Sequence, residues 1–467
     1  MNDDETFEND LRATLAGLAR EPAPGRLFAR VSGIPDREPS ARTHGVRPSL
    51  SPRGSGSGFA LLAAAVAIAV FAIIVRPGIS PSTVGGSPSA TPGQPTSVGS
   101  SDPSAQVSPS DAVVATPSPT PAGEPVPADF EPQSATFVSA DNGWVLGSVP
   151  CGGARCPAII RTVDGGATWS SIDAPKTTLS GGVLGSVQAG GAGISSLRFA
   201  DLLNGWAFGP ELWATHDGGA TWGRLTISGL PAGATVTALE TSAGTVHAVL
   251  YDAAQDFRIG SSRVGADDWR VAAVRVPVGA GPVPRIELRL SGSSGWVLEN
   301  DRIVSGGATL DAGMWRTWQP ACLDVVGPAV LAASSASDLV AVCDVGLWAS
   351  PKGEQLFTST DGGATFAATG TRPPLTASAV ASPDRATIVI AGSDTSGAAA
   401  LVASLDGGRT WSKVWSAGAV SFTDAVSFTD LGFTTPTQGI VVTTDESGAG
   451  KLLMTHDGGR TWTPATF

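Results

Sequence analysis

The stretch Thr162-Val-Asp-Gly-Gly-Ala-Thr-Trp169 decides the fold, because the chain repeats it. Four further plain copies are Thr215-His-Asp-Gly-Gly-Ala-Thr-Trp222, Ser359-Thr-Asp-Gly-Gly-Ala-Thr-Phe366, Ser404-Leu-Asp-Gly-Gly-Arg-Thr-Trp411 and Thr455-His-Asp-Gly-Gly-Arg-Thr-Trp462. Two degenerate copies fit the long gap after the second: Ser262-Arg-Val-Gly-Ala-Asp-Asp-Trp269 and a stretch ending in Trp318. The seven aromatic positions are then spaced 53, 47, 49, 48, 45 and 51 residues apart. This period predicts seven structural units.

A second motif keeps the same period. Asn142-Gly-Trp144, Asn204-Gly-Trp206, Ser294-Gly-Trp296 and Gln438-Gly-Ile440 each follow a short apolar stretch. The intervals from 206 to 296 and from 296 to 440 are 90 and 144 residues, which are two and three units. Two independent motifs with one period make a chance resemblance improbable.

The residues of the repeated box suit a tight turn that ends in an aromatic anchor. The Asp carboxylate can accept backbone N–H bonds within the turn, and the two Gly residues adopt positive φ at little steric cost. The Trp or Phe can bury a large apolar area between neighbouring sheets. A calcium loop would need alternating oxygen ligands, which the box lacks. We therefore expect structural roles for Asp164, Gly165, Gly166, Thr168, Trp169, Asp217, Gly218, Gly219, Thr221, Trp222, Asp361, Gly362, Gly363, Thr365, Phe366, Asp406, Gly407, Gly408, Thr410, Trp411, Asp457, Gly458, Gly459, Thr461 and Trp462.

A unit of about 48 residues accommodates four short strands, which is one propeller blade. In the first unit we expect strands near 134–139, 143–148, 157–162 and 167–172. The fold prediction is an all-β, seven-bladed β-propeller over residues 129–467. Only residues 463–467 follow the last box, so no strand is left over to complete the first blade. Closure should rest on the packing of blade 7 against blade 1, helped by residues 126–133.

These boxes, together with the G-W-x-x-G elements Gly143-Trp-Val-Leu-Gly147 and Gly205-Trp-Ala-Phe-Gly209, resemble the BNR or Asp-box repeat family. They look most like the photosystem II assembly-factor-type propellers, and many bacterial secreted or membrane-anchored proteins are similar. The resemblance covers roughly residues 130–467. It implies the propeller fold and says little of function, because propellers support many activities.

The residues before the propeller differ in composition. Residues 1–58 are polar and rich in Pro, and we expect a mostly disordered cytoplasmic tail. Phe59–Val75 holds 17 residues without a charge, close to the shortest helix that spans a bilayer. Residues 76–128 are rich in Pro, Ser and Thr, which predicts an extended stalk.

We interpret Phe59–Val75 as a retained signal anchor in a single-pass membrane protein. A cleaved signal peptide and a buried soluble helix are the alternatives. Eight Arg residues precede this segment, whereas the first basic residue after Arg76 is Arg155. The positive-inside rule then places the N-terminus in the cytoplasm and the propeller outside the cell membrane.

Net charge and chemistry exclude several function classes. The 467 residues carry a net charge of −12 without a basic stripe, which argues against a nucleic-acid partner. No spacing indicates a zinc site, a phosphate loop or a nucleophile elbow, so we expect no cofactor or metal. His216 and His456 occupy the same variable box position and should be exposed turn residues.

Asp boxes also occur in sialidases, so an enzyme is an alternative. Phe257-Arg-Ile-Gly260 nearly matches the sialidase F/Y-R-I-P element, but Gly replaces Pro, and Tyr251 is the only Tyr. Alternation along a strand places Arg285, Glu287 and Arg289 on one side, where they could line the central channel. A solvated face is the alternative for these three residues.

The four Cys residues all follow the predicted anchor. Cys151 and Cys156 are close in sequence, and Cys322 and Cys343 enclose 20 residues. Pairing within each set is the simplest of three connectivities, and an oxidising exterior would permit it. Four buried free thiols are the alternative.

The leading functional hypothesis is a non-catalytic module that binds an extracytoplasmic protein or glycan, or assists assembly. The alternatives are a carbohydrate-binding or glycoside-hydrolysing surface protein, and a receptor whose cytoplasmic tail relays binding at the propeller.

Overall fold

The computed structural model describes residues 123–467, except 181–190, 231–232, 253–255, 279–285, 300–305, 324–328, 345–352, 418–426 and 446–448. The tail 1–58, the expected anchor Phe59–Val75 and most of the stalk 76–128 lie outside the described residues. Within the described part of the chain, no helix is long and apolar enough to cross a bilayer.

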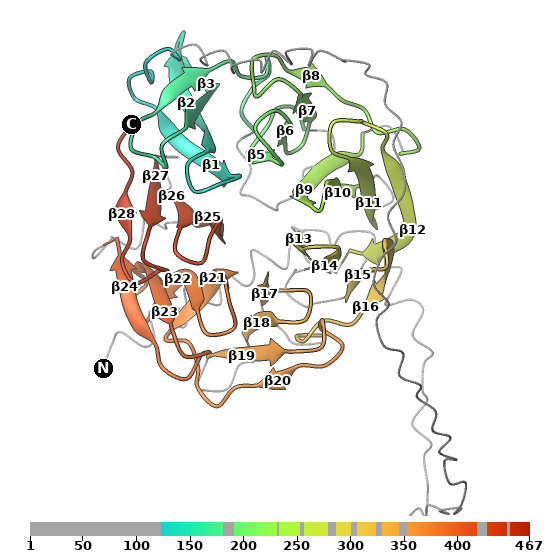
Figure 1. The fold of residues 1–467 in the computed structure, drawn as a ribbon, viewed down its shortest axis with the longest axis vertical. Helices are drawn as coiled ribbons and strands as arrows, with labels where there is room; N and C mark the ends of the chain where they lie inside the picture. The colour runs from blue at the N-terminus through green and yellow to red at the C-terminus, as the bar shows by residue number, and fades with distance from the viewer. Residues whose placement is uncertain are drawn as a thin grey trace, which may run out of the picture. The chain divides into compact units, whose positions relative to one another are not determined.

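Seven four-stranded antiparallel sheets follow one another along the chain and form a ring (Figure 1), which confirms the seven-bladed propeller. Each blade uses four consecutive strands, with the first nearest the axis. Blade 1 holds β1 (Glu131–Phe137), β2 (Gly143–Cys151), β3 (Ala154–Thr162) and β4 (Ser170–Ile172). Blade 2 holds β5 (Ser196–Phe199), β6 (Gly205–Phe208), β7 (Leu212–Thr215) and β8 (Gly223–Arg224). Blade 3 holds β9 (Thr235–Ser242), β10 (Thr245–Tyr251), β11 (Asp256–Arg263) and β12 (Arg270–Pro277).

The remaining four blades have the same order. Blade 4 holds β13 (Ile286–Ser291), β14 (Ser294–Glu299), β15 (Gly306–Asp311) and β16 (Met314–Trp318). Blade 5 holds β17 (Ala329–Ala333), β18 (Leu339–Asp344), β19 (Glu354–Ser359) and β20 (Ala367–Ala368). Blade 6 holds β21 (Leu375–Ala381), β22 (Ile388–Asp394), β23 (Ala399–Ser404) and β24 (Ser412–Ser416). Blade 7 holds β25 (Ser427–Phe433), β26 (Gly439–Thr444), β27 (Gly450–Thr455) and β28 (Thr463–Pro464).

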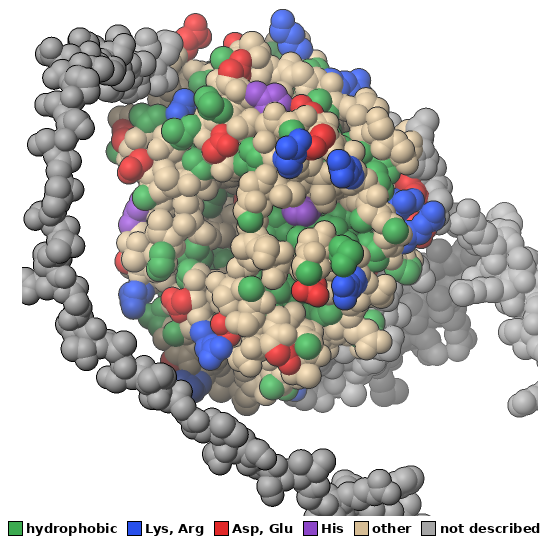
Figure 2. Space-filling view, turned by 45° about the vertical axis from the view of Figure 1, so that its right-hand side comes forward, with side chains coloured by type: hydrophobic (Ala, Val, Ile, Leu, Met, Phe, Trp, Pro, Cys, Tyr) green, Lys and Arg blue, Asp and Glu red, His purple; other side chains and the backbone are tan. Residues whose placement is uncertain are grey.

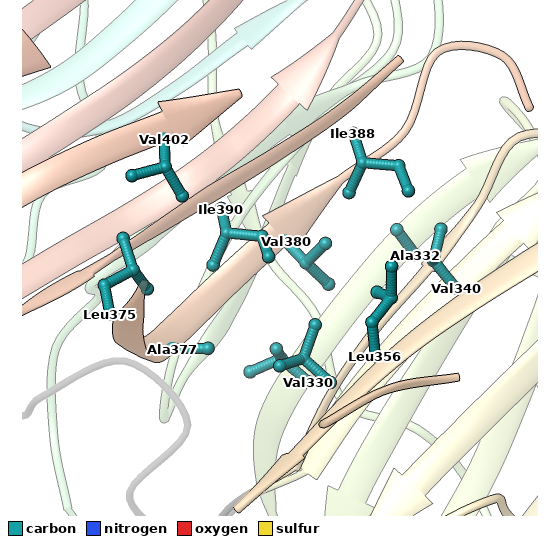
Figure 3. Packing of buried hydrophobic residues seen from close by; sticks show 11 residues of the cluster. Val330, Ala332, Val340, Leu356, Leu375, Ala377, Val380, Ile388, Ile390 and Val402 are labelled. Carbon is teal, nitrogen blue, oxygen red and sulfur yellow. The ribbon is translucent and has the colours of Figure 1, made fainter. Parts of the chain in front are cut away.

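The hydrophobic core lies between blades rather than within them. The described residues form seven buried clusters, and each cluster joins two neighbouring blades. Figure 3 shows the cluster of blades 5 and 6, where Val330 and Leu356 face Val380 and Ile390. A four-stranded sheet with two apolar faces cannot shield both alone, so each blade depends on its neighbours.

The tryptophans of the two motifs meet at the same interfaces. The G-W tryptophan of one blade and the box aromatic of the next blade join one cluster. The pairs are Trp144 with Trp222, Trp206 with Trp269, and Trp296 with Phe366. The G-W tryptophan side chains are at most 1% exposed. Of the five plain box aromatics, only Trp462 is buried, and the other four are half-buried. The G-W motif therefore supplies the deeper anchors, and the box supplies half-buried ones.

Blades 3 and 4 depart from the box in different ways. In blade 3, Asp268 takes the role of the box Asp, since its Oδ1 accepts the Ser262 hydroxyl at 2.9 Å and the Arg263 N–H at 3.1 Å. In blade 4, a two-residue turn at Ala312 and Gly313, with φ of 48° and 76°, replaces the box.

The assignment of Trp318 as the fourth box aromatic is therefore wrong. Trp318 ends β16 and packs toward blade 5, whereas Trp315 packs toward blade 3, as a box aromatic does. The two side chains lie three positions apart on one strand, so they point to opposite faces. Regular spacing selected the wrong tryptophan because a two-residue turn shortens the unit.

The ring closes without a shared strand, in agreement with the sequence expectation. The Gln438 amide of blade 7 donates to the Ala140 carbonyl of blade 1 at 2.8 Å, and the Thr429 hydroxyl donates to the Gln133 carbonyl at 3.2 Å. Phe467 packs edge-on against Phe130 at 5.3 Å between ring centroids. Val126 and Phe130 join the cluster that links blades 7 and 1, so residues before β1 assist the closure.

Both disulfides form with the simplest pairing, which confirms that prediction. Cys151–Cys156 closes the β2–β3 hairpin, and Cys322–Cys343 joins the connection after β16 to β18, with Cα–Cα distances of 5.8 and 5.9 Å.

We expect the double variant Cys322→Ser/Cys343→Ser to lose about 3 kcal/mol in unfolding free energy, because the loop is no longer closed in the unfolded chain. Urea unfolding monitored by near-UV circular dichroism measures this. An unchanged midpoint in the double variant would contradict a stabilising role, and Cys151→Ser/Cys156→Ser serves as the short-loop control.

Candidate binding cavity

A cavity of about 420 Å³ lies at the centre of the ring. It is lined by the innermost strands of blades 1, 2, 3, 4, 6 and 7. Five charged side chains are among the lining residues: Arg198, Glu240, Glu287, Arg289 and Asp430. Glu287 and Arg289 were expected there from their alternation on β13, and Arg285 lies outside the described residues.

Two of the arginines occupy the same place in different blades. Arg198 on β5 lies opposite Trp206, and Arg289 on β13 lies opposite Trp296. Directly opposed residues in an antiparallel pair share a face of the sheet. Each arginine therefore extends toward the next blade, beyond the tryptophan that anchors the interface.

Arg198 is the centre of a network that joins four blades. Its Nε lies 2.8 Å from Glu240 Oε1 of blade 3, and its Nη2 lies 2.5 Å from Asp430 Oδ1 of blade 7. Asp430 Oδ2 also accepts the Ala135 N–H of blade 1 at 3.0 Å. Burial alone would lower the pKa of Arg198, but the charges and hydrogen bonds of Asp430 and Glu240 outweigh it and raise that pKa. The guanidinium thus stays charged in the cavity wall.

A second, smaller network braces blade 4 to blade 5. Glu287 Oε2 accepts the Leu331 N–H at 3.0 Å, and Arg289 Nε donates to the Leu331 carbonyl at 2.8 Å. Arg289 Nη2 lies 3.4 Å from Glu287 Oε2. Both side chains therefore satisfy the backbone of β17 at the cavity wall.

Sequence reasoning missed Arg198, Glu240 and Asp430. The signal for Arg198 was available, because it precedes a G-W motif at nearly the same distance as Arg289 does. Asp430 gave no such signal. It has φ of 52° in a bulge of β25, and the bulge directs its carboxylate toward blades 1 and 2.

The sialidase-like elements do not gather at the cavity. Phe257 is fully buried in β11, and Tyr251 packs against it at 5.6 Å between ring centroids. Arg258 lies 3.9 Å from Asp252. None of these four residues is among those that line the cavity. Among the described residues, no group of three or more His, Cys, Asp or Glu side chains could hold a metal.

The five plain Asp boxes are closed hydrogen-bond rings. In each, Asp Oδ1 accepts a hydroxyl two residues before it at 2.8 Å and the N–H of the Thr four residues after it at 2.9 Å. The hydroxyl of that Thr donates to Oδ2. Hydrogen bonds from Thr365 lower the pKa of Asp361 to about 2, and those from Thr410 do the same for Asp406. The carboxylates are thus engaged within their own turns.

Both box histidines are exposed, and His216 also contacts the neighbouring blade. His216 Nε2 lies 2.9 Å from Asp267 Oδ2 of blade 3, and its Nδ1 lies 2.8 Å from Asn204 Oδ1. His456 is also exposed. His216 therefore bridges two blades at the surface.

The Glu354 carboxyl is buried away from the cavity, between blades 5 and 6. Glu354 is 4% exposed, and its Oε1 accepts the Ala377 N–H at 3.0 Å. Its Oε2 has no hydrogen-bond partner among the described residues. Burial, with a smaller contribution from Asp344, raises the pKa of Glu354 to about 7.

Stability should therefore decrease as pH rises from about 4.5 to about 7, because the native state holds a proton that the unfolded chain releases. Above pH 7 this contribution is constant. We expect Glu354→Gln to abolish the dependence and to stabilise the protein at pH 8 by about 3 kcal/mol. Urea unfolding between pH 5 and pH 8 checks this, with Glu131→Gln, at the partly exposed ion pair with Arg155, as the control. Equal pH slopes in Glu354→Gln and the unaltered protein would contradict the assignment.

Comparison with known proteins finds similarity among solved structures. No family model and no curated protein matches the chain. Among solved structures, YCF48 bound to D1 peptide is 18% identical, with a TM-score of 0.45, and covers 71% of this chain and 95% of its own. YCF48 from Cyanidioschyzon merolae is 17% identical, with a TM-score of 0.45, and covers 71% and 97%. The GH74 enzyme of Niastella koreensis is 12% identical, with a TM-score of 0.37, and covers 72% and 71%. A peptide-bound protein and an enzyme are thus both similar to this chain.

Proposed function

We propose that this protein is a membrane-anchored, extracytoplasmic propeller that binds a partner protein without catalysis, as a binding or assembly module. The observation that carries the proposal is that the charged groups in the cavity bind one another and the backbone of neighbouring blades. Both Asp430 oxygens are occupied, one by Arg198 and one by the Ala135 N–H, and Glu287 and Arg289 hold the backbone of β17. These side chains brace the ring.

A glycosidase would use this space differently. It needs two carboxyls about 5–9 Å apart, one to protonate the leaving group and the other to attack the sugar or activate water. Both oxygens of Asp430 already accept hydrogen bonds, and Glu240 and Glu287 both face guanidinium groups. The arrangement therefore favours a scaffold over a catalyst.

The membrane anchor is part of the proposal and is supported by Phe59–Val75 and the Arg residues before it. We expect the full chain to remain in the membrane pellet after alkaline extraction and external protease to cleave the propeller from intact cells. A chain that begins at residue 77 is the matched control and should be soluble.

The binding role is tested by cross-linking the full chain in bacterial membranes and recovering it by affinity. We expect a specific protein partner that is absent when a chain with an unrelated extracytoplasmic domain on the same anchor is used. Recovery of no protein, together with turnover of glycoside substrates by the purified chain, would overturn the proposal in favour of a carbohydrate-active protein.

A further inference from the structure

At the interface of blades 3 and 4, a histidine replaces the tryptophan that blades 1, 2 and 4 have at the same position. The G-W position of blade 3 is His247, which lies opposite Glu240 as Trp206 lies opposite Arg198. The imidazole is smaller than the indole at this position in blades 1, 2 and 4, and the Trp315 ring packs edge-on against it at 5.4 Å between ring centroids. A cleft of about 690 Å³ lies at this interface, between the start of β12 and the turn that leads into β16.

Two features of the backbone shape the cleft. β12 has 8 residues, whereas the outermost strands of the other blades have 2 to 5. Its residues 272–274 lie opposite the single residue Ile259, which forms a bulge beside the cleft. Bulges commonly redirect side chains next to binding sites.

The wall of the cleft is apolar and held in place. Met314 is 55% exposed, and Trp315, Val271 and Ala272 are half-buried beside it. The Trp315 indole N–H donates to His247 Nδ1 at 3.3 Å, and Ser261 Oγ lies 2.7 Å from the same nitrogen. Figure 2, which brings the side of blades 3 and 4 forward, shows hydrophobic side chains gathered there with basic side chains nearby.

Most polar groups of the cleft are already engaged. Arg263 binds Asp268 through Nε at 3.1 Å and Nη2 at 2.9 Å, and the Ser262 hydroxyl also donates to Asp268. A sugar would need several free hydrogen-bonding groups, which are committed here. Arg270 is exposed and has no ion-pair partner among the described residues. The cleft therefore offers an apolar wall and one available cation.

Charge favours an acidic partner at this place. The charged residues that line the cleft are Arg263, Arg270 and Asp268, a net charge of +1, whereas the whole chain has a net charge of −12. The net negative charge of the chain disfavours an acidic segment, whereas the exposed Arg270 at the cleft attracts one.

We propose that this cleft docks a partner-protein segment in which a large apolar side chain is flanked by carboxylates. The apolar side chain lies against Met314 and Trp315, and a carboxylate pairs with Arg270. The proposal rests on the proposed binding function and names the surface that performs it.

The experiment uses the methyl groups of methionine in the full chain. The sequence has 3 Met residues, of which Met314 lines the cleft and Met454 is buried between blades 7 and 1. The full chain in detergent, labelled with carbon-13 at the Met methyl groups, is titrated with the end-blocked peptide Gly-Asp-Phe-Asp-Gly. We expect the Met314 methyl signal to shift and the Met454 signal to stay. The Lys analogue of the peptide should need at least about ten times the concentration.

Two variants localise the binding. Arg270→Glu should reverse the preference between the Asp and Lys peptides, and Ala273→Trp, at an exposed position beside the cleft, should abolish the shift. Arg316→Glu, also exposed on blade 4 but outside the cleft, should leave binding unchanged. A native Met454 signal shows that each variant is folded.

An unshifted Met314 signal, equal binding of the Asp and Lys peptides, or unaltered binding to Arg270→Glu would overturn the proposal. If Arg270→Glu and Ala273→Trp capture the membrane partner as well as the unaltered chain does, the binding function stands and this surface is wrong. If glycoside turnover replaces partner capture, the binding function is wrong whatever the peptide result.

Discussion

Asp430→Ala should lower the unfolding free energy by about 3–5 kcal/mol, the range for removing one partner of a buried ion pair. The substitution leaves the Ala135 N–H without its acceptor and Arg198 with only Glu240 as a charged partner. Because no strand is shared between blades 7 and 1, this carboxylate is a principal polar link across the closure. Urea unfolding measures the loss.

Local opening distinguishes a closure role from a general loss of stability. Hydrogen exchange in Asp430→Ala should increase most in β1 and β25, and less in β13 and β17. Glu287→Gln, which alters the corresponding brace between blades 4 and 5, is the matched control and should reverse this pattern. A loss below about 1 kcal/mol, or uniform acceleration across all blades, would show that closure rests on apolar packing alone.

Trp206→Ala should cost about 3–5 kcal/mol, because a fully buried indole leaves a cavity between blades 2 and 3. The Trp206 indole N–H has no hydrogen-bond partner in the part of the chain that the structure describes, so the loss is one of packing. Trp206→Phe should therefore restore most of the stability. Trp269→Ala removes the half-buried box aromatic from the same interface and should cost roughly half as much. Equal losses for Trp206→Ala and Trp269→Ala would contradict the ranking of the two motifs.

Much of the fold follows from local sequence. The Asp-Gly-Gly turn satisfies its own hydrogen bonds, as in the closed ring around Asp164, so its structure needs no distant residue. Unit number and blade order follow from the period of these turns. The error at Trp318 has the same origin, since spacing alone cannot tell on which face of a strand a side chain lies.

The contacts between charged side chains in the cavity could not be predicted from the repeat period. Arg198 and Asp430 are 232 residues apart in sequence, and the closure of the ring brings them together. The alternation of β13 indicated which residues share a face, but only the packed neighbour showed that Glu287 and Arg289 hold β17.

The sequence by itself determined the number of blades, their order and the turns, because these depend on local hydrogen bonding and on apolar faces that recur at a constant interval. The tertiary structure alone decided which charges meet at the axis and where a cleft opens between two blades. Those features arise from side chains of blades far apart in the chain, and their positions exist only once the ring is closed.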